Sequence, residues 1–237
     1  MEFYHEGQDR LRIAVVAKHD FYLTDAKEAF IGLPYNVEVF GDLETLSLGL
    51  EKYSKSDLIF FPHFSEIIPE KIYMNFNCIG FHTGDLPGDR GGSPIQNIIQ
   101  SGRYSTMVSA FRIREGIDSG PIYLQKSIDL SQGSIADMLK SLSQISATMM
   151  VEIVLNSPTP IEQRGTGQFI RRRNPQQSVL PMDLANARAV HDHSRMLDGL
   201  DYPRAYIEYG NLRIELFSSD FTSEGLSALC SIQIKER

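Results

Sequence analysis

Two residues in this sequence, a histidine and an aspartate, combine chemical reactivity with unusual surroundings. His82 ends an apolar run and precedes a loop dense in glycine and proline, which suits the close approach of a ligand to the backbone. Asp118 follows 36 residues later, in the turn 116–121. A lone histidine at a strand end is more often structural, but a carboxylate beside an imidazole favours the protonated ring and lets the pair exchange a proton with a substrate. We therefore expect an acid–base site here.

The elements that must position this pair alternate along the first half of the chain. Short apolar runs predict strands, stretches with helical spacing predict helices, and glycine or proline separates them. The expected strands are 11–17, 36–40, 57–61 and 77–82, and the expected helices are 24–30, 43–53 and 69–74. Such alternation predicts an open, mainly parallel α/β sheet with ligands at the carboxyl ends of its strands. No G-x-G-x-x-G motif follows the first run, so a dinucleotide-binding loop is not expected.

The second half of the chain predicts a hairpin, a long helix and a separate final unit. A helix over 93–101 precedes two strands that flank the turn of Asp118, and an apolar stripe of helical period fills 134–155. Residues 156–179 are rich in proline, glycine and arginine, which predicts a linker or a long loop. The remaining expectations are strands at 105–114, 121–127, 205–209, 212–217 and 226–234, and a helix at 184–197. We therefore expect a main α/β domain over 1–175 and a small C-terminal α+β appendage over 176–237.

Composition and charge exclude several classes of protein. The 237 residues are 42% hydrophobic and 22% charged, which is typical of a globular domain and not of a disordered chain. The first ten residues do not resemble a signal peptide, and we expect no apolar run of membrane-spanning length, so a cytoplasmic protein with no membrane partner is predicted. A net charge of −7 disfavours extended binding to nucleic acid, although a small phosphate-bearing ligand needs only a few local cations.

Two further groups of residues invite interpretation as ligand sites. His191 and His193 are close in sequence but point to different faces of the expected helix, and Cys78 and Cys230 have no zinc or redox motif around them. We therefore expect no metal. The run Arg171–Arg173 is typical of a solvated charged surface, and a contact with a diphosphate or another anionic tail is the alternative.

The sequence around His82 and Asp118 resembles the 10-formyltetrahydrofolate-dependent formyltransferases. That family places Asn-x-His before a Ser/Thr-x-x-Leu-Pro loop, and an aspartate in an Asp-Thr/Ser-Gly turn at a similar separation. The matching residues here are His82, Leu86-Pro87, Arg90-Gly91 and Asp118-Ser119-Gly120. The resemblance covers roughly two thirds of the chain and implies a Rossmann-like formyltransferase fold, with N10-formyltetrahydrofolate as co-substrate and no metal.

The resemblance also implies a role for each member of the site. Formyl transfer to an amine passes through a tetrahedral oxyanion, which His82 can stabilise while Asp118 holds the imidazole in the useful state. The family's asparagine falls on Gly80 in this chain, so one oxyanion donor is missing. Loss of such a donor costs on the order of 3 kcal/mol. Substitution by another group is expected, with Asn97 as the predicted catalytic amide and Gln96, Thr83 and His63 as alternatives.

Further residues are assigned to the co-substrate and to the acceptor by the same resemblance. Core packing is the alternative for Phe61 and Phe64, two of the residues assigned to the folate. The residues expected to hold the folate are Phe61, His63, Phe64, Leu86, Arg90, Gly91 and Ile117. The residues expected to contact the acceptor substrate are Thr83, Arg195 and Tyr202.

The identity of the acceptor rests on resemblance alone. The loop with Asp85-Leu86-Pro87 and Gly91-Gly92-Ser93-Pro94, together with the segment 195–203, resembles the enzymes of the pseudaminic acid type, which implies a nucleotide-linked amino-dideoxy sugar, such as a UDP-4-amino-4,6-dideoxyhexose, destined for a surface glycan. The tRNA enzymes of the family carry a larger C-terminal β-barrel and favour positive charge, so the roughly sixty residues after Val179 and the net charge of −7 disfavour a tRNA acceptor. The alternatives are a methionyl-tRNA or carrier-bound aminoacyl acceptor, and a non-catalytic folate- or nucleotide-binding module. The residues leave the oligomeric state open, a homodimer included.

Overall fold

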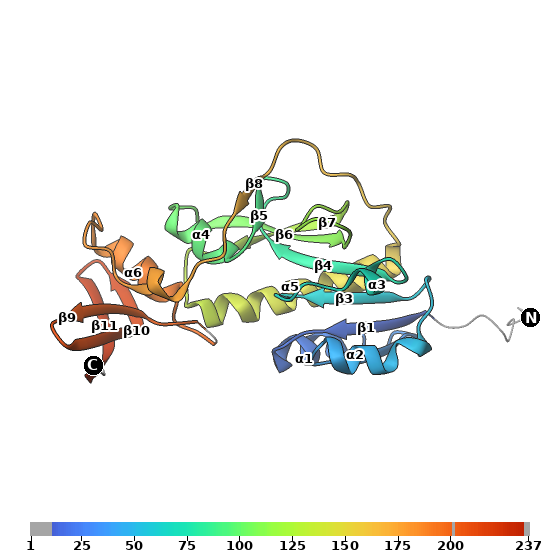
Figure 1. Cartoon of the computed structure of the whole chain (residues 1–237), viewed down its shortest axis with the longest axis horizontal. Helices are drawn as coiled ribbons and strands as arrows, with labels where there is room; N and C mark the ends of the chain where they lie inside the picture. Colours follow the sequence, from blue (N-terminus) through green and yellow to red (C-terminus); the bar gives the residue numbers. More distant parts are fainter. Residues whose placement is uncertain (1–10, 201, 235–237) are drawn as a thin grey trace, which may run out of the picture. The chain divides into compact units, whose positions relative to one another are not determined.

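A computed structural model describes residues 11–200 and 202–234 of the chain (Figure 1). The described residues form two compact units, and neither is continuous in sequence. Unit 1 contains the chain up to His82 together with 108–126 and 143–165, and unit 2 contains 83–107, 127–142 and the chain from 166 onward. These units are discontinuous, and the last change from one to the other lies between Gly165 and Thr166. The domain boundary expected at residue 175 stays a prediction.

Unit 1 is built on a six-stranded sheet with the strand order β2-β1-β3-β4-β6-β7, apart from the ends of β4, β6 and β7, which belong to unit 2. The first four of these strands run parallel, as the alternation of strands and helices predicts. β6 and β7 are joined by the turn that contains Asp118, so the expected hairpin is confirmed. The strands are β1 (Arg12–Val16), β2 (Asn36–Phe40), β3 (Leu58–Pro62), β4 (Asn77–Thr83), β6 (Ser105–Arg112) and β7 (Ile122–Asp129). The helical elements of this unit are α1 (Asp20–Ala29), α2 (Leu43–Gly49), η1 (Leu50–Lys52) and α3 (Glu70–Tyr73).

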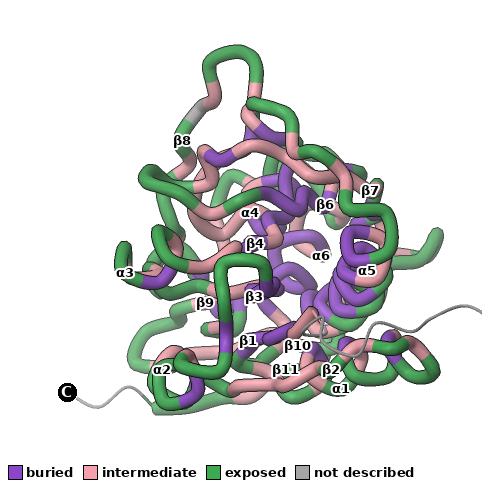
Figure 2. Tube along the Cα trace, turned by 90° about the vertical axis from the view of Figure 1, so that its right-hand side faces the viewer, coloured by how far each residue is buried: buried purple, intermediate pink, exposed green. Residues whose placement is uncertain are grey.

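Burial of the apolar runs explains why these segments form the centre of the sheet. All five residues of β3 are buried (Figure 2), and one face of β1, β3 and β4 packs against Leu46 of α2. Asp42 begins α2 by accepting a hydrogen bond from the backbone N–H of Thr45 at 2.7 Å. α1 begins at Asp20, four residues before the expected start, because buried Tyr22 packs its first turn into the core.

The helix α5 (Ile135–Asn156) begins with the capping box that its sequence predicts. The Ser134 N–H donates to Asp137 Oδ2 at 3.0 Å, and the Asp137 N–H donates back to Ser134 Oγ at 3.3 Å. Among the described residues, this is the one helix that is long and apolar enough to cross a membrane. The expectation that no apolar run has that length is therefore wrong. Just over half of the apolar window is buried inside the protein, which is typical of a core helix.

Unit 2 combines a short parallel ribbon, two helices and a three-stranded antiparallel sheet with the order β11-β10-β9. The predicted C-terminal helix and its three strands are confirmed. The ribbon of β5 and β8 was not expected, because three-residue strands have no periodicity to detect. Gly91 allows the two strands to approach, since a Cβ added there would lie 2.1 Å from the carbonyl oxygen of Ile170. The elements are β5 (Asp89–Gly91), α4 (Pro94–Gln100), β8 (Gln168–Ile170), η2 (Pro175–Ser178), α6 (Ala187–Arg195), β9 (Ala205–Tyr209), β10 (Leu212–Thr222) and β11 (Gly225–Ile234).

Candidate active site

The structure brings His82 and Asp118 together in unit 1. His82 lies at the carboxyl end of β4 and is 6% exposed. Its Nδ1 atom is 3.3 Å from Oδ2 of Asp118. A carboxylate at Nδ1 orients the imidazole, and a paired histidine and carboxylate are groups that can take part in acid–base chemistry.

Asp118 is held in this position by an unusual turn. Its φ of +48° is in the left-handed region, which costs a non-glycine residue on the order of 1 to 3 kcal/mol. The side chain of Gln163 stabilises the turn by donating to the backbone carbonyl oxygens of Asp118 at 2.8 Å and Gly120 at 2.7 Å. The sequence analysis missed Gln163, which lies in the segment expected to be a loop and has no motif around it.

Gly80 has a steric explanation in this chain. A Cβ atom built there would lie 2.9 Å from Cζ of Phe111 and 3.3 Å from Cγ1 of Ile113. The aromatic ring of Phe111 therefore occupies the space into which a side chain at position 80 would extend. An asparagine at position 80 would therefore require the ring of Phe111 to shift.

Asn97, the residue predicted to replace that amide, already has a backbone partner in unit 2. Its Nδ2 atom donates to the carbonyl oxygen of Gly92 at 3.0 Å, beside the start of α4. This bond ties the glycine-rich segment to the helix. The catalytic role of Asn97 stays a prediction, and the structure gives its side chain a structural contact.

The residues expected to hold the co-substrate in unit 1 have different environments. Phe61 is 1% exposed and belongs to the core, as its alternative interpretation held, and Phe64 packs on it edge-on with ring centroids 5.4 Å apart. His63 follows β3 and stacks on Tyr22, with centroids 5.8 Å apart and an interplanar angle of 2°. Ile117 is 57% exposed and precedes Asp118, so it is accessible to a ligand.

The other residues expected to hold the co-substrate, together with Thr83, lie in unit 2. Leu86 and Thr83 are buried, and Arg90 and Gly91 are half-buried in β5. An ion pair that the sequence analysis missed fixes this loop, because both terminal nitrogens of Arg103 donate to Asp89, at 2.7 and 3.1 Å. The roles of Leu86, Arg90 and Gly91 in folate binding, and of Thr83 in acceptor binding, stay predictions.

Arg195 and Tyr202, expected to contact the acceptor, also belong to unit 2. Arg195 is 2% exposed, and its Nε atom donates to Oδ1 of Asp192 at 2.6 Å. Tyr202 is half-buried and follows the helix. The structure thus shows Arg195 as a buried part of α6, and its contact with the acceptor stays a prediction.

The two histidines of α6 have separate partners. His193 Nε2 is 3.3 Å from the carbonyl oxygen of Ser178, and His191 Nδ1 is 3.1 Å from Oγ of Ser219. Burial lowers the pKa of each of them below its ordinary value. Over residues 11–200 and 202–234, no group of three or more His, Cys, Asp or Glu side chains is arranged to hold a metal ion.

Comparison with known proteins identifies the family. The model of the family described as Formyl transferase matches residues 46–154, and the model described as Methionyl-tRNA formyltransferase, C-terminal domain, matches residues 175–233. A solved structure of methionyl-tRNA formyltransferase from Clostridium thermocellum is 32% identical, has a TM-score of 0.87 and covers 94% of this chain and 99% of its own. The chain belongs to the formyltransferase family. The predicted formyltransferase fold is confirmed.

The same comparisons correct the expectation about the acceptor. Methionyl-tRNA formyltransferase from Thermotoga maritima is 28% identical over 175 residues, which are 69% of this chain and 54% of that protein. A 4-N formyltransferase from Francisella tularensis is only 18% identical, with a TM-score of 0.64 over 96% of this chain and 98% of its own, and shares the fold alone. The prediction of a nucleotide-sugar acceptor, and with it a small-molecule partner, is therefore wrong. The glycines of the loop on which it depended are explained by packing, because a Cβ at Gly91 would lie 2.1 Å from the carbonyl oxygen of Ile170 and one at Gly92 would lie 2.5 Å from Cβ of Arg172.

The chain spans about half the length of most of the curated relatives that it matches. The family and the fold rest on the Clostridium thermocellum structure, of which the chain covers 99%.

Proposed function

We propose that this chain transfers the formyl group of N10-formyltetrahydrofolate to the amine of an aminoacyl-tRNA, with methionyl-tRNA as the first candidate. The observation that carries the proposal is the pairing of His82 Nδ1 with Asp118 Oδ2 at 3.3 Å at the end of β4. Support for the acceptor comes from the names of the relatives and from the C-terminal family model over residues 175–233.

In this proposal each member of the pair has a part in the reaction. The amine attacks the formyl carbon, the carbonyl oxygen becomes an oxyanion, and the bond between this carbon and N10 then breaks. A hydrogen bond from His82 Nε2–H stabilises the oxyanion, and Asp118 orients the ring through its contact with Nδ1. The proton lost by the amine is received by the pair, and N10 takes one proton as it leaves.

The net charge of −7 limits how such a chain can meet a nucleic acid. A broad electrostatic grip on the phosphate backbone is unfavourable at this charge, whereas recognition of the aminoacylated end requires only a few local cations. Binding then depends weakly on salt, because the slope of log affinity against log salt scales with the number of phosphates neutralised. We expect a slope no steeper than about −3 for this chain, corresponding to roughly three phosphate contacts.

Product analysis tests the proposal directly. The full chain is incubated with methionyl-tRNA and 10-formyltetrahydrofolate, and the released amino acid is identified by mass spectrometry. We expect N-formylmethionine with the unmodified chain and with Glu152→Gln, whose exposed carboxylate pairs with Lys126 in unit 1, but none with His82→Ala. Absence of product from a folded chain that still binds folate would overturn the proposal and favour a non-catalytic module, with Phe111 beside Gly80 as the structural reason.

A further inference from the structure

The turn that carries Asp118 in unit 1 has a tightly constrained backbone. Gly116 and Asp118 have positive φ angles of +90° and +48°. A Cβ added at Gly120 would clash with the carbonyl oxygen of Arg112, so the turn is pressed against the end of β6. The left-handed region is unfavourable for a residue with a side chain, so the conformation of Asp118 needs support from its surroundings.

A side-chain amide from a distant segment supplies this support. Nε2 of Gln163 donates to the backbone carbonyl oxygens of Asp118 at 2.8 Å and Gly120 at 2.7 Å. Both partners can only accept hydrogen bonds, so the NH₂ group, with its two hydrogens, is the end of the amide that satisfies them. A carboxylate or an apolar side chain of similar size cannot make these bonds. The amide therefore fixes the peptide groups that follow Asp118 and Gly120.

The segment that carries this amide is anchored beside the turn. Ile161 and Ile122 exchange two backbone hydrogen bonds of 2.8 Å in an antiparallel bridge at the start of β7. Arg114 donates through Nη1 to Glu162 at 3.0 Å and through Nη2 to the carbonyl oxygen of Ser119 at 2.9 Å. Pairing of the two preceding residues therefore holds the amide next to the turn.

The conformation of the turn bears on the reaction through the contact between two side chains. Asp118 Oδ2 lies 3.3 Å from Nδ1 of His82. Rotation of the Asp118 backbone out of the left-handed region would swing its Cβ and carry the carboxylate away from the imidazole. A displacement of about 1 Å at a catalytic group can cost roughly a hundredfold in rate. The bonds to the backbone of the turn therefore control a distance on which the proposed chemistry depends.

We propose that Gln163 is a positioning residue, which holds Asp118 in its left-handed conformation and so keeps the carboxylate against His82. The expected effect on rate rests on the proposed formyl transfer, whereas the effect on the contact between the two side chains does not require any reaction. Because Gln163 acts through Asp118, its contribution to the rate disappears once that carboxylate has been removed.

Rates of N-formylmethionyl-tRNA formation test the inference with Gln163→Leu, which keeps a side chain of similar size and removes both donors. We expect kcat to fall roughly 10- to 100-fold, with KM for both substrates within about threefold of the unmodified chain. Gln163→Glu keeps the size of glutamine but places an acceptor against two carbonyl oxygens, so an equal or larger loss is expected. The matched control is Gln125→Leu, because the Gln125 amide donates to Ser109 Oγ at 2.8 Å, between β7 and β6, and its loss is expected to leave the rate unchanged.

A double-mutant cycle separates positioning from a general loss of structure. In the Asp118→Asn background, Gln163→Leu is expected to lower the rate by less than about threefold further, because the contact that Gln163 serves is already impaired. A loss of stability alone would lower the rate equally in both backgrounds. Equal losses in the two backgrounds, or a kcat of Gln163→Leu within about threefold of the unmodified chain, would overturn the inference.

Nuclear magnetic resonance of the chain labelled with ¹⁵N-histidine gives a readout that needs no turnover. The signals of His82 are identified by their absence from His82→Ala. We expect Gln163→Leu and Asp118→Asn to shift the Nδ1 resonance of His82 in the same direction, and Gln125→Leu to leave it in place. A resonance that Gln163→Leu does not move would overturn the inference. If the unmodified chain forms no product, the proposed function fails, and this resonance alone decides whether Gln163 positions Asp118.

Discussion

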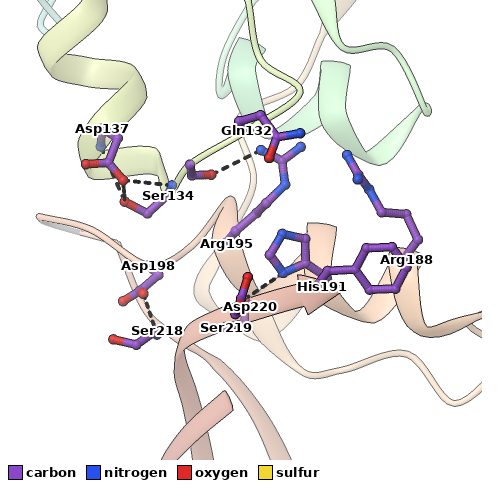
Figure 3. A pocket seen from close by; sticks show the side chains of 12 residues that line it. Gln132, Ser134, Asp137, Arg188, His191, Arg195, Asp198, Ser218, Ser219 and Asp220 are labelled. Carbon is purple, nitrogen blue, oxygen red and sulfur yellow. Dashed lines mark hydrogen bonds between the residues drawn. The ribbon is translucent and has the colours of Figure 1, made fainter. Parts of the chain in front are cut away.

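Two polar regions of this chain are built in different ways. In unit 1, His82 and Asp118 each follow a recognisable strand, and the fold only has to bring two strand ends together. In unit 2, a polar cavity combines three segments between residues 132 and 221 (Figure 3), and no sequence motif links these segments to one another. The first region depends on turn geometry and a single charge pair, and the second depends on a buried network around Asp192. Chemistry placed at strand ends can be predicted from sequence, whereas an arrangement assembled from distant segments cannot.

The largest expected effect on stability tests the buried network of unit 2. Asp192→Asn keeps the volume but leaves Arg188 and Arg195 without their shared carboxylate, so we expect the free energy of unfolding to fall by about 3 to 5 kcal/mol. Urea titration followed by circular dichroism measures this change. The control is Glu152→Gln in unit 1, which breaks the exposed pair with Lys126 and is expected to cost about 1 kcal/mol or less. Equal effects of the two variants would contradict the contrast between the units.

Gly80→Asn tests the packing of unit 1. The new side chain meets the ring of Phe111, and overpacking of this kind costs about 1 to 3 kcal/mol of unfolding free energy. The matched control is Gly41→Asn, because nothing lies within 4 Å of a Cβ at Gly41. A stable Gly80→Asn variant with raised activity would show that Phe111 moves easily and that the missing amide limits the rate.

The pH dependence of stability distinguishes the histidines of α6. Burial lowers the pKa of His193 below 6.5 in the folded state, so the unfolded chain binds more protons at acidic pH. The stabilisation is present above about 6.5, the unfolded value, and is lost as the pH falls through the lower folded pKa. We expect the unfolding free energy to decline as the pH falls below about 6.5, and we expect His193→Gln to flatten this decline. An unchanged slope in His193→Gln would mean that His191 or another group is responsible.

The smallest effect concerns the two thiols, which report on the two units separately. Cys78 is buried in unit 1, where burial raises its pKa to about 12, whereas Cys230 of β11 is exposed. Because the thiolate is the reactive form, labelling of the native chain at pH 8 should modify Cys230 quickly and Cys78 only after unit 1 opens. Peptide mapping identifies which thiol reacts, and fast labelling of Cys78 would contradict the buried core described for β4.

The strands and helices of the fold followed from the sequence because burial and periodicity are local. The apolar run of β3 and the capping box of Ser134 were visible without any tertiary information. The ribbon of β5 and β8 and the support of Asp118 by Gln163 were not, since each depends on a contact between residues far apart in the chain. The acceptor was predicted wrongly from a local resemblance of one loop and one segment, and from net charge, which is a sum over the whole chain and does not report the few contacts that a substrate makes.

The central claim is that the pair of His82 and Asp118 carries formyl transfer. The most direct test is the rate of N-formylmethionyl-tRNA formation by Asp118→Asn beside the unmodified chain, with folate binding measured in parallel. The amide keeps the shape of the turn but removes the charge facing His82 Nδ1. We predict a rate lowered by roughly 10²- to 10⁴-fold with folate binding retained, as expected for loss of acid–base catalysis. A rate within a few-fold of the unmodified chain would contradict the account.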